Sequence, residues 1–220
     1  MVNYEVDPGL LRSRVPRGVE LDLWNGRCLV SLVGFQFLDT RVLGVPVPFH
    51  RDFPEVNLRF YVRRVVGDEV RRAVVFLKEI VPRRALALVA NAVYNENYIA
   101  LPMRTSDTGN RVEYGWSHRG RSFTLGASLD GEPALPPPDA EASFIAEHYW
   151  GYVTQRDGGT MEYRVEHPPW RVTRGKDAVF AGDATALYGA DFAAILAGKP
   201  SSSFVAEGSE VLVRRGVRLS

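Results

Sequence analysis

The strongest constraint on the fold is the stretch 53–62, in which apolar and polar side chains alternate without a break. A period of two is typical of a β-strand, where successive side chains point to opposite faces. The apolar face carries Val56, Leu58, Phe60 and Val62, and the polar face carries Glu55, Asn57, Arg59 and Tyr61. Side chains two residues apart on the polar face stand about 7 Å apart. A carboxylate, an amide, a guanidinium and a phenol in one row suit the floor of a polar pocket. The alternative is an ordinary solvent face that carries one Glu–Arg pair.

The length of the chain allows one large β-rich domain or two small ones, and the only candidate linker, the Pro-rich stretch 131–139, is short and has predicted strands on both sides. The chain has 220 residues, of which 45% are hydrophobic, and we expect one domain over residues 1–220. Its formal net charge of +1 gives no reason to expect a nucleic acid or an anionic membrane surface as a partner. A single cysteine, Cys28, predicts no internal disulfide and favours a cytoplasmic location. Neither a signal peptide nor a membrane-spanning helix is expected from the apolar runs.

Lysine is scarce in this chain. Only Lys78, Lys176 and Lys199 are present among 27 basic residues. Few amines are therefore available for Schiff-base chemistry with a carbonyl compound.

Further strands and three helices are predicted along the rest of the chain. Turn-forming residues join pairs of apolar runs into hairpins: 19–24 with 27–37 through Asn25-Gly26, 55–64 with 70–80 through Gly67-Asp68, 111–117 with 122–129 through 118–121, and 149–155 with 161–167 through 156–159. Helices are expected at 83–94, at 140–150 with Asp139 as its cap, and at 190–196. The Pro-rich stretch 131–139 is expected to be an extended connector. This content predicts an α+β fold with a dominant antiparallel sheet that closes into a barrel.

Four segments, taken in order, resemble the YqjF-like family of uncharacterised bacterial proteins, which is grouped with the acetoacetate decarboxylase-like superfamily. The segments are 53–62, 93–98 followed by 101–103, 144–150, and 167–170, and the similarity extends over roughly residues 15–218. The resemblance implies a cone-like, mostly antiparallel closed β-barrel, with flanking helices outside and a pocket inside. It implies no function, because the family has no established one.

The same resemblance bears on the chemistry. Acetoacetate decarboxylases use a lysine that forms a Schiff base, beside a second lysine that lowers its pKa. The resemblance places that pair near Glu96-Asn97-Tyr98, where this chain has no lysine. It therefore implies a shared cavity without the shared reaction.

We take Glu55, Arg59 and Glu96 as candidate catalytic residues. Arg59 would bind a carboxylate or enolate bidentately, while Glu55 acts as a base or orients the arginine. The alternative is a buried Glu55–Arg59 ion pair that only fills the barrel. Glu96 would be an acid or base in a second pocket wall, and the alternative there is a helix end with local caps. The candidate ligand-binding residues are Asn57, Tyr61, Tyr94, Asn97, Tyr98, His148 and Trp170.

No metal site and no other cofactor are predicted. Glu147, His148 and His167 carry suitable ligand groups. However, adjacent residues on a helix point about 100° apart, so Glu147 and His148 would not share one ion easily. The segment 167–170 is instead expected to end a strand, with Trp170 packed at the barrel mouth.

The sequence thus predicts a bacterial, cytoplasmic protein whose barrel pocket binds or transforms a small organic acid or carbonyl compound without a Schiff-base lysine. The alternative is a non-catalytic structural or protein-interaction module with a filled interior. Whether the chain is an enzyme, and its oligomeric state, are left open.

Overall fold

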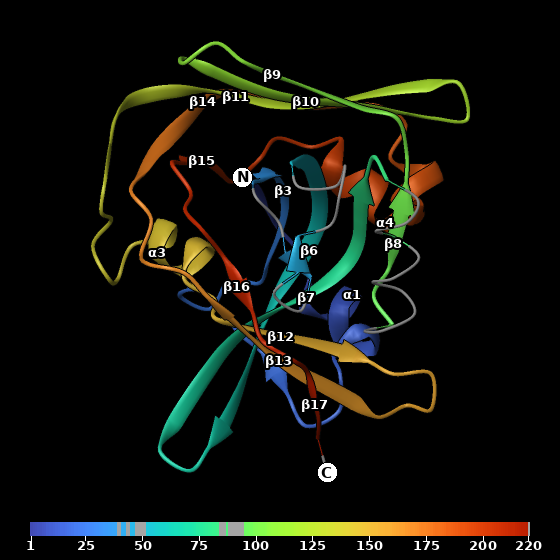
Figure 1. Ribbon diagram of the computed structural model, residues 1–220, viewed down its shortest axis with the longest axis vertical. Coiled ribbons are helices and arrows are strands. Elements are labelled where there is room, and N and C mark those ends of the chain that lie inside the picture. The colour runs from blue at the N-terminus through green and yellow to red at the C-terminus, as the bar shows by residue number, and fades with distance from the viewer. Residues whose placement is uncertain (39–40, 43–44, 47–51, 84–86, 88–94, 220) are drawn as a thin grey trace.

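A computed structural model describes the chain except residues 39–40, 43–44, 47–51, 84–86, 88–94 and 220. Strands dominate it (Figure 1). One sheet contains 15 strands in the order β16-β13-β12-β7-β6-β3-β1-β15-β14-β11-β10-β9, with β2, β8 and β17 attached beside this path. A separate small hairpin consists of β4 and β5.

The strands have the following bounds: β1 Val2–Glu5, β2 Glu20–Leu21, β3 Leu29–Phe37, β4 Arg41–Val42, β5 Val45–Pro46, β6 Phe53–Val66, β7 Glu69–Val81, β8 Tyr98–Ala100, β9 Met103–Asp107, β10 Arg111–His118, β11 Arg121–Ala134, β12 Trp150–Thr154, β13 Thr160–Glu166, β14 Val172–Ala181, β15 Ser202–Ala206, β16 Leu212–Val213 and β17 Val217–Arg218. The described helices are α1 Pro8–Leu11, the 3₁₀ turn Arg12–Arg14, α3 Glu141–Ala146 and α4 Thr185–Leu196.

The sheet is mostly antiparallel, as predicted, but its closure is not observed. The path ends at β9 on one side and at β16 on the other, and these two strands are not paired in the described part of the chain. Two pairings, β7 with β8 and β7 with β12, are parallel. In Figure 1 the layer of β9, β10 and β11 lies across the end of the β3, β6 and β7 strands.

The central hairpin of β6 and β7 confirms the prediction for residues 55–80 and extends it at both ends. The ladder runs from Val66↔Glu69 beside the turn down to Val56↔Ile80. One irregularity lies between Leu58 and Arg59: Leu58 pairs with Lys78, whereas Arg59 pairs with Phe76. The strand β7 therefore carries one extra residue, Leu77, which is a β-bulge.

The predicted N-terminal hairpin is correct only at its turn. Asn25 and Gly26 both have positive φ, 49° and 77°, and Trp24 bridges Arg27. Beyond that bridge the two arms separate. The arm Glu20–Leu21 pairs with β6, and β3 pairs with β1 and β6. A turn signal is local, and it does not determine which neighbour satisfies the rest of a strand.

The second hairpin is confirmed, with β10 and β11 joined through Arg119 and Gly120, both at positive φ. The strand β11, however, continues to Ala134, so part of the predicted connector is a strand that pairs with β14. The hairpin of β12 and β13 is also confirmed.

The helices differ from expectation in their bounds. The helix α3 ends at Ala146 because Glu147 leaves helical geometry, and the aromatic run from Trp150 forms strand β12 instead. Its cap is Ala140 and not Asp139, and no side chain bonds there. The helix α4 begins at Thr185, earlier than predicted, and is interrupted at Gly189, which has φ 82°. The predicted helix 83–94 falls largely outside the described residues.

The apolar face of β6 packs into the main core. Val56, Leu58, Phe60 and Val62 are fully buried there, together with residues of α1, α4, β10 and β11. The opposite face of the same strands looks toward α3, β14 and β15, where a smaller apolar cluster includes Tyr61, Phe144 and Phe204. Because the strand is covered on both sides, its polar residues are placed inside the molecule.

No helix in the described part of the chain is both long enough and apolar enough to span a membrane.

Candidate functional site

The polar face of β6 is shielded from solvent. Only 2% of Glu55 and 1% of Asn57 and Tyr61 is exposed, while Arg59 is half-buried. The interpretation of this face as an ordinary solvated sheet surface is therefore wrong. Burying such groups is costly unless they are hydrogen-bonded.

Glu55 is the centre of a buried acid cluster. Its Oε1 accepts a hydrogen bond from Asn57 Nδ2 at 3.1 Å, and its Oε2 accepts one from the Tyr98 hydroxyl at 3.2 Å. Tyr98 also shares a hydrogen bond with Glu79, which is 1% exposed. The Tyr98 hydroxyl thus connects two buried carboxyl groups that come from neighbouring strands.

Glu96 completes the cluster. The Tyr163 hydroxyl donates to Glu96 Oε1 at 2.9 Å, and Glu96 shares a side-chain hydrogen bond with Glu79. A hydrogen bond between two carboxyl groups requires a proton on one of them. Glu96 and Tyr98 keep partial exposure, unlike Glu55 and Glu79. We refer to Glu55, Asn57, Glu79, Glu96, Tyr98 and Tyr163 as the acid cluster.

Burial raises the pKa of all three carboxyl groups above the ordinary glutamate value. Desolvation raises the pKa of Glu55 to about 7, against the lowering effects of Asn57, Tyr98 and the Arg59 charge. It raises the pKa of Glu96 to about 8, with a further contribution from the Glu55 charge. It raises the pKa of Glu79 well above its ordinary value, helped by repulsion from Glu96 and Glu55. At neutral pH the cluster therefore holds protons that free glutamates would release.

Arg59 does not form the predicted ion pair with Glu55. Its guanidinium donates to the Ile145 carbonyl oxygen at 3.0 Å, at the end of α3, and lies 5.6 Å from the centre of the Tyr61 ring. No carboxylate of the described residues lies within 4 Å of it. Its charge still reaches Glu55, whose pKa it lowers. Arg59 is thus a cation beside the acid cluster with a buried Nε that no described group satisfies.

His148 and Tyr61 lie on the far side of Arg59 from the cluster. The Tyr61 hydroxyl shares a 2.6 Å hydrogen bond with Ser31, and its ring lies 4.7 Å from that of His148. His148 Nε2 is 3.5 Å from Asp22 Oδ2, at the limit of a hydrogen bond, and neither ring nitrogen has a well-formed bond to a described residue. Burial lowers the pKa of His148 to about 4, so the ring is neutral at physiological pH.

The remaining candidate ligand-binding residues do not line the acid cluster or lie outside the described residues. Asn97 is exposed, accepts from Lys78 Nζ and donates to the Leu77 carbonyl, so it does not line the acid cluster. Trp170 stacks on His167 at 4.1 Å and donates to Ser209. Tyr94 lies outside the described residues.

Sequence reasoning missed Glu79 and Tyr163. Glu79 sits in a return strand read as apolar, and it faces Asn57 only because of the bulge at Leu77. With a regular ladder from the turn, Lys78 would face Asn57 instead. Tyr163 reaches Glu96 because Gly151, its partner on β12, has no side chain: a Cβ there would overlap the Tyr163 ring. The one signal in the sequence for Glu79 was the presence of a carboxyl group within an otherwise apolar strand.

The described residues contain no group of three or more His, Cys, Asp or Glu arranged to hold a metal ion. A surface hollow of about 220 Å³ lies away from the acid cluster, between β14 and α4, and is lined in part by Phe180, Asp183 and Leu196.

Comparison with solved structures identifies the fold. An acetoacetate decarboxylase-like enzyme from Sphingomonas wittichii RW1 matches with a TM-score of 0.62 at 14% identity, over 99% of this chain and 89% of that one. Acetoacetate decarboxylase from Legionella pneumophila subsp. pneumophila str. Philadelphia 1 matches with 0.66 at 12% identity, over 100% and 83%. The enduracididine biosynthesis enzyme MppR complexed with pyruvate matches with 0.66 at 17% identity, over 100% and 86%. At these identities the similarity shows the fold alone.

Sequence comparison gives a nearer relative. The uncharacterised protein YqjF of Bacillus subtilis (strain 168) is 27% identical over 192 residues, which are 85% of this chain and 77% of that protein. The model of the family DUF2071, described as an uncharacterised conserved protein, matches residues 1–210. The chain therefore belongs to the DUF2071 family and has an acetoacetate decarboxylase-like fold.

Proposed function

We propose that this protein binds a small organic acid or carbonyl compound at the acid cluster and that Glu55 exchanges a proton with it. The observation that carries the proposal is the convergence of Glu55, Glu79 and Glu96 with two tyrosine hydroxyls in a buried site beside Arg59. The Schiff-base route is left out, because no lysine lies in the cluster. The cytoplasm remains the proposed compartment.

The three acids have different parts in this proposal. Glu55, with a pKa of about 7, is partly ionised at neutral pH, which suits a general base. Glu96, with a pKa of about 8, is mostly protonated there, and burial raises the pKa of Glu79 well above its ordinary value, so both suit donation of a hydrogen bond to a developing oxyanion. Arg59 has a buried Nε without a described partner, and it would bind the ligand's carboxylate.

The proton exchange is a simple enolisation. The C–H bond next to the ligand's carbonyl breaks, its proton moves to Glu55, and the electron pair moves to the carbonyl oxygen. A protonated carboxyl, Glu96 or Glu79, stabilises the enolate oxygen by a hydrogen bond. Return of a solvent-derived proton restores the ligand, so the exchange needs no further reactant.

One observation favours the alternative, a filled and non-catalytic interior. Both oxygens of Glu55 already accept hydrogen bonds from protein groups. In that case the hydrogen bonds of the acid cluster would only fix the packing of β6, β7 and β8 against one another.

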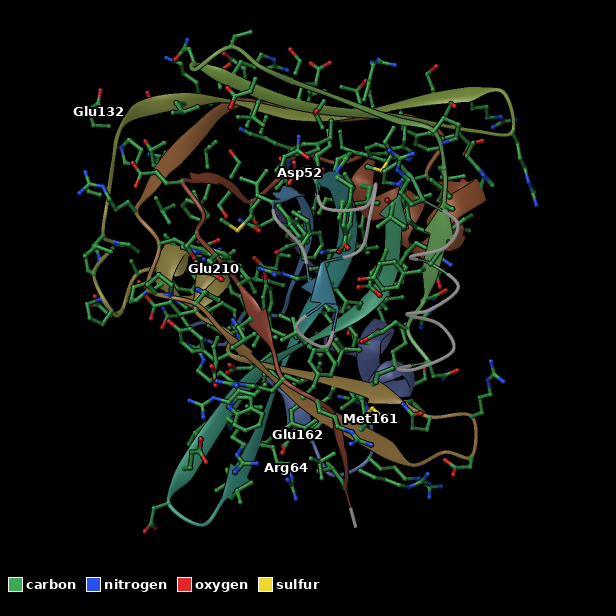
Figure 2. The ribbon with its side chains drawn as sticks, viewed as in Figure 1. Asp52, Arg64, Glu132, Met161, Glu162 and Glu210 are labelled. Carbon is green, nitrogen blue, oxygen red and sulfur yellow. The ribbon has the colours of Figure 1, made fainter. Side chains whose placement is uncertain are left out.

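Deuterium exchange distinguishes the two. Pyruvate is the first probe, because a protein of this fold has been solved in complex with it. In D₂O at neutral pH we expect the wild-type protein to speed loss of the pyruvate methyl signal in ¹H NMR. The variant Glu55→Gln should lose about 100-fold or more of this rate, the usual contribution of a general base. Glu132→Gln, which changes an exposed glutamate on β11, is the matched control; Figure 2 labels this residue at the edge of the molecule. Equal rates for wild type and Glu55→Gln would favour the filled interior.

A further inference from the structure

Two buried oxygen atoms in the acid cluster accept no hydrogen bond from any described residue. They are Asn57 Oδ1 and Glu79 Oε2, and both residues are 1% exposed. Asn57 and Glu79 are directly opposite one another on β6 and β7, so the two side chains emerge next to each other on the same face. A buried polar atom that lacks a hydrogen bond destabilises the fold, which makes two neighbouring cases informative.

The next residue on the same face of β6 has a hydrogen-bond donor that lacks an acceptor among the described residues. Arg59 lies two residues beyond Asn57, about 7 Å along an extended strand. Its buried Nε donates to no described group. Within the described part of the chain, the strands β6 and β7 thus present one unsatisfied acceptor each, Asn57 Oδ1 and Glu79 Oε2, and the next residue on the same face of β6, Arg59, has one unsatisfied donor, its Nε.

A ligand that satisfies both ends must combine a hydrogen-bond donor with an anion. A hydroxyl group and an ammonium group both donate to Asn57 and Glu79. The ammonium group is favoured by its surroundings, because Glu55, Glu79 and Glu96 lie together and Arg59 is the described cation acting on Glu55. A positive charge placed among these carboxyl groups stabilises their ionised forms.

We infer that the ligand of the acid cluster is a short amino acid, whose ammonium group binds between Asn57 and Glu79 and whose carboxylate binds Arg59. This inference rests on the proposed function and specifies the substrate class of the same site. The groups that face the ammonium are Glu55, Glu79, Glu96, Tyr98 and Tyr163. Because the carboxyl groups retain protons before binding, the ammonium should displace protons into the solvent.

Isothermal titration calorimetry with isosteric probes tests the inference. The probes are 4-aminobutanoate, 4-hydroxybutanoate and pentanoate, which differ only in one end group. At neutral pH we expect 4-aminobutanoate to bind at least tenfold more tightly than pentanoate, with 4-hydroxybutanoate between them. Titration in two buffers of different ionisation enthalpy should show proton release with 4-aminobutanoate alone.

The variant Glu79→Gln keeps the shape of the side chain but removes its charge. It should lose at least tenfold in affinity for 4-aminobutanoate and little for pentanoate, whereas the surface control Glu132→Gln should change neither. If Glu79→Gln does not fold, the comparison of probes on the unmodified protein still decides.

The failures of the two proposals can be told apart. If pyruvate exchanges deuterium at Glu55 but 4-aminobutanoate binds no better than pentanoate, the inference is overturned and the proposed function stands; water then satisfies the two acceptors. If neither pyruvate nor any of the three probes acts on or binds the protein, both are overturned. Tight binding of 4-aminobutanoate that Glu79→Gln leaves unchanged would also refute the placement of the ammonium.

Discussion

Replacing Glu55 by glutamine removes one buried ionisable group with little change of shape, and its effect on stability should depend on pH. The pKa of this carboxyl is raised from 4.5 to about 7 in the folded protein. The folded state therefore holds a proton that the unfolded chain releases. The corresponding stability is fully present below about pH 4.5 and is lost as the pH rises through about 7. At 1.36 kcal/mol per pKa unit, the loss from Glu55 is roughly 3 kcal/mol.

Urea unfolding at about pH 5 and about pH 8.5 measures this loss directly. Between these conditions the wild-type free energy of unfolding should fall by roughly 2.5 kcal/mol more than that of Glu55→Gln, because part of the total is already lost at about pH 5. Removal of the Glu55 charge also lowers the pKa of Glu79 and Glu96, which reduces the variant's pH dependence further. The control Glu132→Gln should follow wild type. Parallel curves for wild type and Glu55→Gln would refute the argument that this carboxyl is buried and protonated.

Three further outcomes are expected. Borohydride treatment with acetoacetate should leave no adduct in the intact mass, because the Lys78 amine lies outside the acid cluster and donates to Asn97; a stoichiometric adduct would contradict this. Arg59→Ala should abolish pyruvate binding in NMR titration and change the free energy of unfolding by only about 1 kcal/mol, since it breaks a single described hydrogen bond. A loss of 3–5 kcal/mol would instead indicate a broken buried ion pair. Gly151→Ala should destabilise by about 1–3 kcal/mol in urea melts, because its Cβ would overlap the Tyr163 ring; wild-type stability would show that the ring moves freely.

The local features of the fold could be predicted from the sequence, and the pairing of distant strands could not. The alternation in 53–62 and the Gly67-Asp68 turn were sufficient for the central hairpin, since both signals act over a few residues. The Asn25-Gly26 turn was correct, but β2 pairs with β6 because partner choice depends on the whole sheet. The aromatic residues after Glu147 form strand β12 rather than the end of a helix. Their pairing with β7 and β13 is stronger than the weak helical pattern in the sequence.

The candidate site was predicted in part for the same reason. Glu55, Asn57, Glu96 and Tyr98 do come together. Glu79 enters only through the β-bulge at Leu77, which shifts the register by one residue and turns Lys78 away. A one-residue shift exchanges the two faces of a strand, and no periodicity in the sequence reveals it. The same limit explains the missing Glu55–Arg59 pair: Arg59 turns to the end of α3, a long-range contact.

The most direct test of the central claim is a ¹³C NMR titration of the glutamate carboxyl groups, assigned through the Glu55→Gln, Glu79→Gln and Glu96→Gln variants. The acid cluster should give a carboxyl that titrates at about 7 for Glu55 and one at about 8 for Glu96. Addition of pyruvate should shift the Glu55 resonance and leave that of exposed Glu132 unchanged. Titration of Glu55, Glu79 and Glu96 near the ordinary glutamate value of 4.5, with no response to pyruvate, would contradict both the buried, proton-holding site and the function proposed for it.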